Sequence, residues 1–179
     1  MGAVLLAMGY VADHERWMMW VALSLLPCAL IFDVLDGSVA RWRQRSSPFG
    51  ADLDSLADVV SFGVAPAAIA FALGMRGALD AVVLIYFVGC GISRLARFNV
   101  TAEALMTDAG KVSHFEGTPI PTSVALVMIL AIAFQLGAVH EDLWLGAVAL
   151  GPLTFHPLVL MYAASGTAMV SATLKIPKP

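Results

Sequence analysis

Four aspartates form the pattern in this sequence that is best suited to chemistry. The first pair, Asp33 and Asp36, is spaced three residues apart at the end of one apolar segment. The second pair, Asp54 and Asp58, is spaced four residues apart at the start of the next. Either spacing puts both carboxylates of a pair on one face of a helix. If the two helices are antiparallel neighbours, all four carboxylates meet at one depth near the helix ends.

Such a cluster requires positive charge nearby. Carboxylates beside lipid repel one another and lose hydration, so each must be protonated, paired or metal-bound. Arg41, Arg43 and Arg45 follow the first pair and could neutralise some of the charge. Hard oxygen ligands in two aligned pairs suit Mg²⁺, Mn²⁺ or Ca²⁺, and two such ions about 4 Å apart can clamp a phosphoryl group. The alternative to metal binding is that the acids are helix-end residues solvated by water among the lipid headgroups. That explanation accounts for a single acid better than for two pairs.

Small residues and an arginine flank the acids. Gly37 and Ala40 follow the first pair, and Gly50 precedes the second. Side chains this small let a helix or a flat ligand approach the backbone closely, although packing alone can explain each of them. Arg41 can donate two hydrogen bonds to a phosphate, and its alternative role is to anchor the helix end. These residues support a ligand site beside the acids.

The elements that position these residues are apolar. Of the 179 residues, 60% are hydrophobic and 13% are charged, and the mean hydropathy is +0.85. Soluble domains carry about a quarter charged residues, so the bilayer must be the solvent for most of this chain. A spanning helix needs about 20 mostly apolar residues. The candidate runs are 17–34, 59–73, 79–92 with an extension through 95, 120–139 and 143–169.

The first apolar stretch, residues 2–11, is too short to span a bilayer. We interpret it as the end of a first helix whose beginning is missing, or as an interfacial segment. The predicted fold is therefore all-α: a polytopic membrane helix bundle of about six transmembrane helices, the first incomplete, in a single domain over residues 1–179. The polar stretch 99–118 is predicted to be a loop, either a disordered connection or a lid over the site.

The basic residues predict an orientation. Most fall on one side of the membrane if the spans alternate: Arg41, Arg43, Arg45, Arg94, Arg97, Lys111, Lys175 and Lys178. The positive-inside rule makes that side, with the acid cluster, the cytoplasmic face of the cell membrane. Short external turns are expected at Asp13, Glu15, Asp80, Glu141 and Asp142. His156 lies inside a predicted span and is expected to bond locally. No nucleic-acid partner is expected.

Residues 33–58 read D-x2-D-G-x2-A-R-x8-G-x3-D-x3-D without departure. The stretch is similar to the signature of CDP-alcohol phosphatidyltransferases, and its eight fixed positions in 26 residues make the resemblance specific. The resemblance implies a membrane bundle of six helices that is usually a homodimer. It also implies two divalent metal ions, Mg²⁺ or Mn²⁺, held by Asp33, Asp36 and Asp54 with Asp58 beside them.

The same resemblance implies further roles at the site. Asp58 would be the general base for the acceptor hydroxyl. CDP-diacylglycerol, whose departing group is CMP, would bind at Gly37, Ala40, Arg41 and Gly50.

Three more stretches, 55–67, 94–100 and 115–121, resemble the phosphatidylserine synthase branch of the family. In the last of them Thr118 stands where leucine is more usual. This branch implies transfer of the phosphatidyl group from CDP-diacylglycerol to L-serine. Arg94 and Arg97, three residues apart, could bind the serine carboxylate or anchor the helix at the interface.

Other functions remain open at this point. Glycerol phosphate or inositol phosphate as acceptor would also suit arginines. A metal or ion transporter would use intramembrane acids, but transporters place such acids near the midplane between repeated halves, and here they lie at helix ends without an internal repeat. A membrane scaffold without chemistry leaves the acids unexplained.

Overall fold

The structure is a computed structural model, which describes residues 1–179 except 44–47, 108–113, 117, 152, 172–174 and 178–179. The α-helices are α1 (Gly2–Asp13), α2 (Arg16–Arg43), α3 (Pro48–Asp58), α4 (Ala65–Leu73), α5 (Ala78–Thr107), α6 (Ser123–Gln135) and α7 (Leu160–Val170). A π-helical segment, η1 (Val59–Val64), joins α3 to α4, and short 3₁₀ turns are η2 (Ile120–Thr122), η3 (His140–Asp142) and η4 (Pro157–Val159). Two small antiparallel pairs complete the described part: β1 (His114–Glu116) with β4 (Lys175–Pro177), and β2 (Val148–Leu150) with β3 (Leu153–Phe155).

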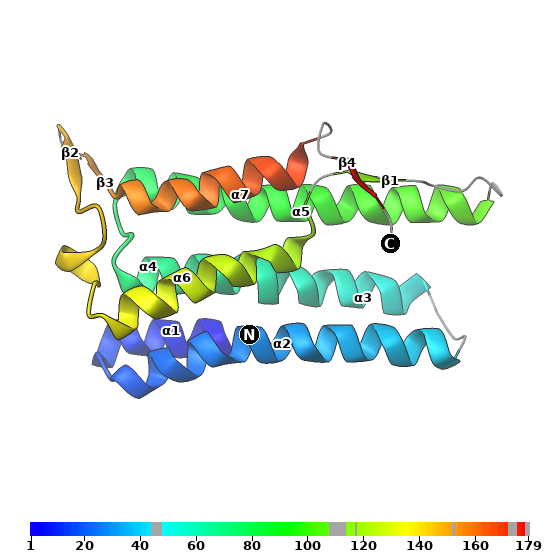
Figure 1. The fold of residues 1–179 in the computed structure, drawn as a ribbon, viewed down its shortest axis with the longest axis horizontal. Coiled ribbons are helices and arrows are strands. Elements are labelled where there is room, and N and C mark those ends of the chain that lie inside the picture. The colour runs from blue at the N-terminus through cyan, green and yellow to red at the C-terminus, as the bar shows by residue number, and fades with distance from the viewer. Residues whose placement is uncertain (44–47, 108–113, 117, 152, 172–174, 178–179) are drawn as a thin grey trace.

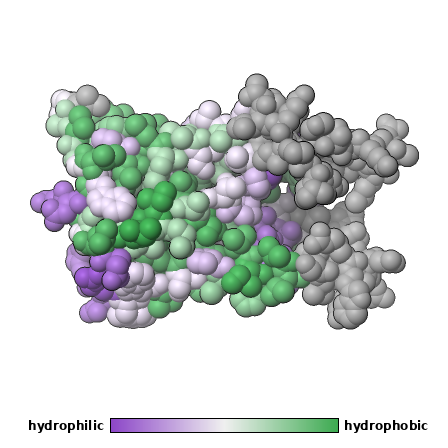
Figure 2. Space-filling model, in the orientation of Figure 1, coloured by the Kyte–Doolittle hydropathy of each residue, from purple (hydrophilic) through white to green (hydrophobic). Residues whose placement is uncertain are grey.

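The helices lie side by side along the long axis of the molecule (Figure 1). Among the described residues, three segments are long and apolar enough to cross a membrane: Arg16–Asp36, Asp52–Leu73 and Ala78–Val100. Shorter apolar helices are Gly2–Asp13, Ile120–Gln135 and Pro157–Val170. Figure 2 shows hydrophobic side chains over much of the face between the helix ends and hydrophilic ones gathered at its left end. The predicted all-α membrane helix bundle is confirmed.

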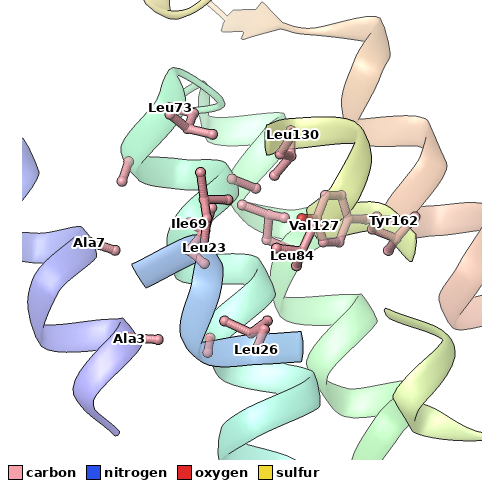
Figure 3. Packing of buried hydrophobic residues seen from close by; sticks show 14 of the residues in the cluster. Ala3, Ala7, Leu23, Leu26, Ile69, Leu73, Leu84, Val127, Leu130 and Tyr162 are labelled. Atoms are coloured by element: carbon pink, nitrogen blue, oxygen red, sulfur yellow. The ribbon is translucent and has the colours of Figure 1, made fainter. Parts of the chain in front are cut away.

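The core lies between α1, α2, α4, α5, α6 and α7 (Figure 3). Ala3 and Ala7 are small enough to bring α1 against α2 and α4, which matters because helices in lipid associate mainly through close packing. Ile69 and Leu130 are fully buried at the centre. Tyr162 of α7 is also fully buried, and its hydroxyl donates a hydrogen bond of 2.9 Å to the carbonyl of Pro66 in α4. Its one polar group is thereby paired.

The run 143–169 was predicted to be one spanning helix, and this is wrong. The structure places the β2–β3 hairpin there, and a helix starts only at η4. Leu145, Gly146 and Gly151 have left-handed φ angles of 71°, 66° and 66°, which a right-handed helix does not allow. Pro157 then stands in the first turn of η4, where its missing N–H has no helical partner to lose.

The predicted loop 99–118 is also partly wrong, because α5 continues to Thr107. Ala102, Glu103, Ala104, Leu105 and Met106 favour helix strongly, and their propensity outweighs the polar character that indicated a loop. At the other end of the acid-bearing helices, α2 ends at Arg43 and α3 begins at Pro48.

Asp80 was predicted to lie in an external turn, but its side chain is fully buried. It accepts hydrogen bonds from the backbone N–H groups of Gly77, at 2.9 Å, and of His156, at 2.8 Å. It also pairs with Nδ1 of the His156 ring, so the expectation of local bonding for His156 is wrong as well. The β2–β3 hairpin brings His156 over the first turn of α5, where a carboxylate is favoured by the helix dipole. Gly77 permits this approach, because a Cβ there would lie 2.1 Å from the carbonyl oxygen of Thr154.

Candidate functional site

The two acid pairs lie on neighbouring helices. Asp33 and Asp36 belong to α2, and Asp54 and Asp58 belong to α3. The two helices run in opposite directions at the end of the bundle where α2 leads into α3 (Figure 1). Asp58 is the last residue of α3, directly before the π-helical segment η1. The antiparallel arrangement therefore puts the end of one helix beside the start of the next.

The two acid pairs interact electrostatically across the two helices. The charges of Asp54 and Asp36 act on Asp33, and those of Asp33 and Asp54 act on Asp58. Asp36 and Asp54 are exposed, whereas Asp33 and Asp58 are partly buried. The structure thus brings the two pairs together into one acidic cluster, defined here as Asp33, Asp36, Asp54 and Asp58.

This donor set suits divalent ions in its chemistry, since it consists of hard carboxylate oxygens whose mutual repulsion a cation relieves. In the part of the chain that the structure describes, no three His, Cys, Asp or Glu side chains are arranged closely enough to hold a metal ion as they stand. The metal site therefore stays a prediction.

Arg94 of α5 joins the acidic cluster. Its positive charge acts on Asp58, and its guanidinium is about half-buried. The Nε atom of Arg94 is buried and has no hydrogen-bond partner among the described residues. Arg97, one turn further, is exposed, and its Nη1 donates a bond of 3.5 Å to the carbonyl of Val170 at the end of α7. Of the two arginines predicted to bind serine, Arg94 lies with the acids and Arg97 reaches another helix.

A hydrogen-bonded pair beside the acids was not predicted from the sequence. Ser55 of α3 has its Oγ 3.0 Å from Nδ2 and 3.2 Å from Oδ1 of Asn99 in α5. Ser55 directly follows Asp54, so this contact ties the acid-bearing helix to the helix that carries Arg94. The available signal was the presence of polar residues within apolar helices, which usually pair across a helix interface.

The predicted CDP-diacylglycerol residues are described only in part. Gly37, Ala40 and Arg41 lie in α2 after the first acid pair, and their side-chain environments fall outside the described part of the chain. Gly50 lies in the first turn of α3 and is exposed. The binding roles of these residues stay predictions.

The π-helical segment η1 follows Asp58 directly. π-Turns are rare and often occur at functional sites, because they shift the helical phase by inserting an extra residue into a turn. Here η1 lies between the acid-bearing helix α3 and the core helix α4. Before η1, Asp54 is exposed and Asp58 partly buried, whereas Phe62 within η1 and Ile69 after it are buried in the core.

The sequence matches the family model for CDP-alcohol phosphatidyltransferase over residues 1–170. The chain therefore belongs to the CDP-alcohol phosphatidyltransferase family, and the resemblance found in residues 33–58 is confirmed. No solved structure matches the chain.

Relatives within this family carry a more particular name. The CDP-diacylglycerol–serine O-phosphatidyltransferase of Saccharomyces cerevisiae is 50% identical over 153 residues, covering 84% of this chain and 55% of the relative. The protein of that name from Helicobacter pylori is 38% identical over 132 residues, covering 73% and 54%. The one from Methanocaldococcus jannaschii is 43% identical over 105 residues, covering 59% and 47%. The chain thus spans about half the length of the curated relatives that it matches.

Proposed function

We propose that this chain transfers the phosphatidyl group of CDP-diacylglycerol to the hydroxyl of L-serine, giving phosphatidylserine and CMP. The observation that carries the proposal is the acidic cluster, with Arg94 beside it, on the two helices that bear the family signature. The names of the relatives support serine as the acceptor. The active site would face the cytoplasm, and the chain would form one domain that acts as a homodimer.

We propose that the four carboxylates of the acidic cluster hold two divalent metal ions, Mg²⁺ or Mn²⁺. When bound, the ions would supply neutralisation of the diphosphate charge, which is the main electrostatic demand of phosphoryl transfer. Gly37, Ala40, Arg41 and Gly50 would bind the CDP part of the lipid substrate. In this scheme Arg41 contributes a bidentate contact to the diphosphate, and the small residues leave room for the nucleotide.

Asp58 is proposed to act as the general base. It is the last residue of α3, it is partly buried, and the positive charge of Arg94 acts on it. Its carboxylate would accept the proton of the serine hydroxyl while that oxygen bonds to the phosphorus and the bond to CMP breaks. A positioned general base contributes about 10²- to 10⁴-fold to the rate.

Arg94 is proposed to bind the serine carboxylate, with Arg97 in a weaker role because it already reaches Val170. A hydrogen bond to a charged group contributes about 1.5–3 kcal/mol, or roughly 10- to 150-fold in affinity. Arg94→Ala should therefore raise the KM for serine by that factor, and the KM for CDP-diacylglycerol by much less. Arg97→Ala, as the matched change, should raise the serine KM less than Arg94→Ala does.

The deciding experiment measures CMP release by the purified chain in detergent. CDP-diacylglycerol is supplied with L-serine, glycerol phosphate or inositol phosphate, each with Mg²⁺ or Mn²⁺. Release of CMP that depends on L-serine supports the proposal. Release only with a phosphorylated alcohol would keep the family chemistry and exclude serine. No release with any acceptor, from a folded preparation, would refute the activity of this chain.

A further inference from the structure

The hydrogen-bonded pair Ser55–Asn99 crosses directly from the acid-bearing helix to the helix that carries Arg94. Both polar atoms of the Asn99 amide face the Oγ of Ser55, with Nδ2 at 3.0 Å and Oδ1 at 3.2 Å. A serine hydroxyl can both donate and accept a hydrogen bond, so the contact forms with either orientation of the amide. Hydrogen bonds of this kind hold neighbouring helices together in membranes.

This contact and the charge interaction of Arg94 with Asp58 belong to one helix interface. The helices α3 and α5 run in opposite directions (Figure 1). In such a pairing a later residue of one helix faces an earlier residue of the other, and the two contacts follow this order. Within residues 52–58 of α3, only Ser55 and Asp58 are half-buried, and the other side chains are exposed. The inward face of α3 in this stretch therefore carries both contacts to α5.

The two contacts are close enough for one to set the geometry of the other. Asp58 is three residues beyond Ser55, and Arg94 is five residues before Asn99. At about 1.5 Å per residue, these separations are about 4.5 Å along α3 and about 7.5 Å along α5. A bond that fixes α3 against α5 at Ser55 therefore also limits how far the Asp58 carboxylate can move from the Arg94 guanidinium. A displacement of about 1 Å at a reacting group can cost about 100-fold in rate.

We propose that Ser55 and Asn99 are positioning residues of the acceptor subsite, whose hydrogen bond holds α3 against α5 and so sets the distance between Asp58 and Arg94. The inference rests on the proposed function, in which Arg94 binds the carboxylate of the acceptor and Asp58 takes the proton of its hydroxyl. These two groups act on opposite ends of one small molecule, so their separation must match its length. Ser55 and Asn99 act through them and do not touch the acceptor.

The kinetic test removes the hydrogen bond from either side without changing a charge. We expect Ser55→Ala and Asn99→Ala each to raise the KM for L-serine about two- to tenfold, the value of one hydrogen bond, and to lower kcat by a similar factor. The KM for CDP-diacylglycerol should stay near the wild-type value, because α2 and α3 keep their own arrangement.

Two double variants separate positioning from general stability. In Ser55→Ala with Asn99→Ala, the loss should be no greater than in either single variant, because the same hydrogen bond is removed. In an Arg94→Ala background, Ser55→Ala should leave the KM for serine unchanged, because the group that it positions is gone. A purely structural role of Ser55 would instead add its loss to that of Arg94→Ala.

Tyr86→Phe is the matched control. This change also removes a hydrogen bond between α5 and another helix, the contact of 3.1 Å between the Tyr86 hydroxyl and Oγ1 of Thr167 in α7. Tyr86 lies eight residues before Arg94, toward the start of α5. The change should leave kcat and both KM values unaltered.

The position of α3 is also measured without turnover. Spin labels are attached to cysteines placed at two exposed residues, Leu56 of α3 and Ile85 of α5, with the exposed Cys28 replaced by serine. We expect a narrow distribution of label distances in the parent protein and in Tyr86→Phe, and a broader one in Ser55→Ala.

The same distribution in Ser55→Ala and in the parent protein would overturn the inference. So would an unchanged serine KM in both single variants, or a loss in Ser55→Ala that persists in full in the Arg94→Ala background. If the wild type releases no CMP with any acceptor, the proposed function fails separately. The distance measurement then decides alone whether Ser55 holds α3 in place.

Discussion

Asp80 offers a quantitative test of the packing, at the end of the bundle remote from the acids. Its buried carboxylate is the acceptor for the N–H groups of Gly77 and His156 and the partner of the His156 ring. Asp80→Ala leaves these three polar groups unpaired in a buried place. Each unpaired buried group costs about 1–3 kcal/mol of stability, and a buried pair that loses one partner costs about 3–5 kcal/mol. We therefore expect the free energy of unfolding of Asp80→Ala to be about 3–5 kcal/mol lower than that of the wild type.

Asp80→Asn should be milder, because its amide oxygen can still accept the N–H of His156. We expect a loss of about 1–3 kcal/mol for the contacts that the amide cannot replace. The assay is equilibrium unfolding in detergent micelles, followed by the loss of helical circular dichroism. Asp142→Ala is the control, since Asp142 is exposed near the same end and a surface change there should stay within about 0.5 kcal/mol.

A free energy of unfolding for Asp80→Ala within about 0.5 kcal/mol of the wild type would refute this reasoning. The order of the variants is a second check. If Asp80→Asn lost as much stability as Asp80→Ala, the hydrogen bond to the His156 backbone would contribute nothing. At a temperature where the variants remain folded, the KM values should match the wild type, because Asp80 begins α5 and the acids lie toward the other end of the bundle (Figure 1).

Three further predictions concern the acidic cluster and the orientation. Removing divalent ions with a chelator should abolish CMP release, and Mg²⁺ or Mn²⁺ should restore it; full turnover with metal verified as absent would contradict the proposed ions. Asp58→Asn should lower kcat about 10²- to 10⁴-fold and largely retain CDP-diacylglycerol binding, whereas Asp36→Asn should also weaken that binding. Normal turnover by Asp58→Asn would exclude Asp58 as the general base. Cysteines placed at Arg43 and Lys111 should be labelled from the cytoplasmic side and one at Glu141 from the outside, and labelling of all three from one side would disprove the orientation.

The sequence was sufficient where spacing and composition act locally. Apolar runs predicted a membrane bundle because lipid requires every backbone polar group to bond within its own helix. The pairs Asp33–Asp36 and Asp54–Asp58 could be placed on helix faces because the helical repeat relates residues three or four apart. The signature that contains them identified the family, since its chemistry depends on a short, continuous stretch of chain.

Other features were decided only by the tertiary structure, because they join residues distant along the chain. Asp80 and His156 are 76 residues apart, and Ser55 and Asn99 are 44 apart. No local pattern indicates which buried polar groups find each other; that depends on how the helices pack. The same holds for Arg94, which the packing of α5 brings to Asp58. The hairpin within the apolar run 143–169 was hidden for a different reason: hydropathy reports the preference for lipid, whereas the left-handed backbone at Gly146 and Gly151 decides where a helix can form.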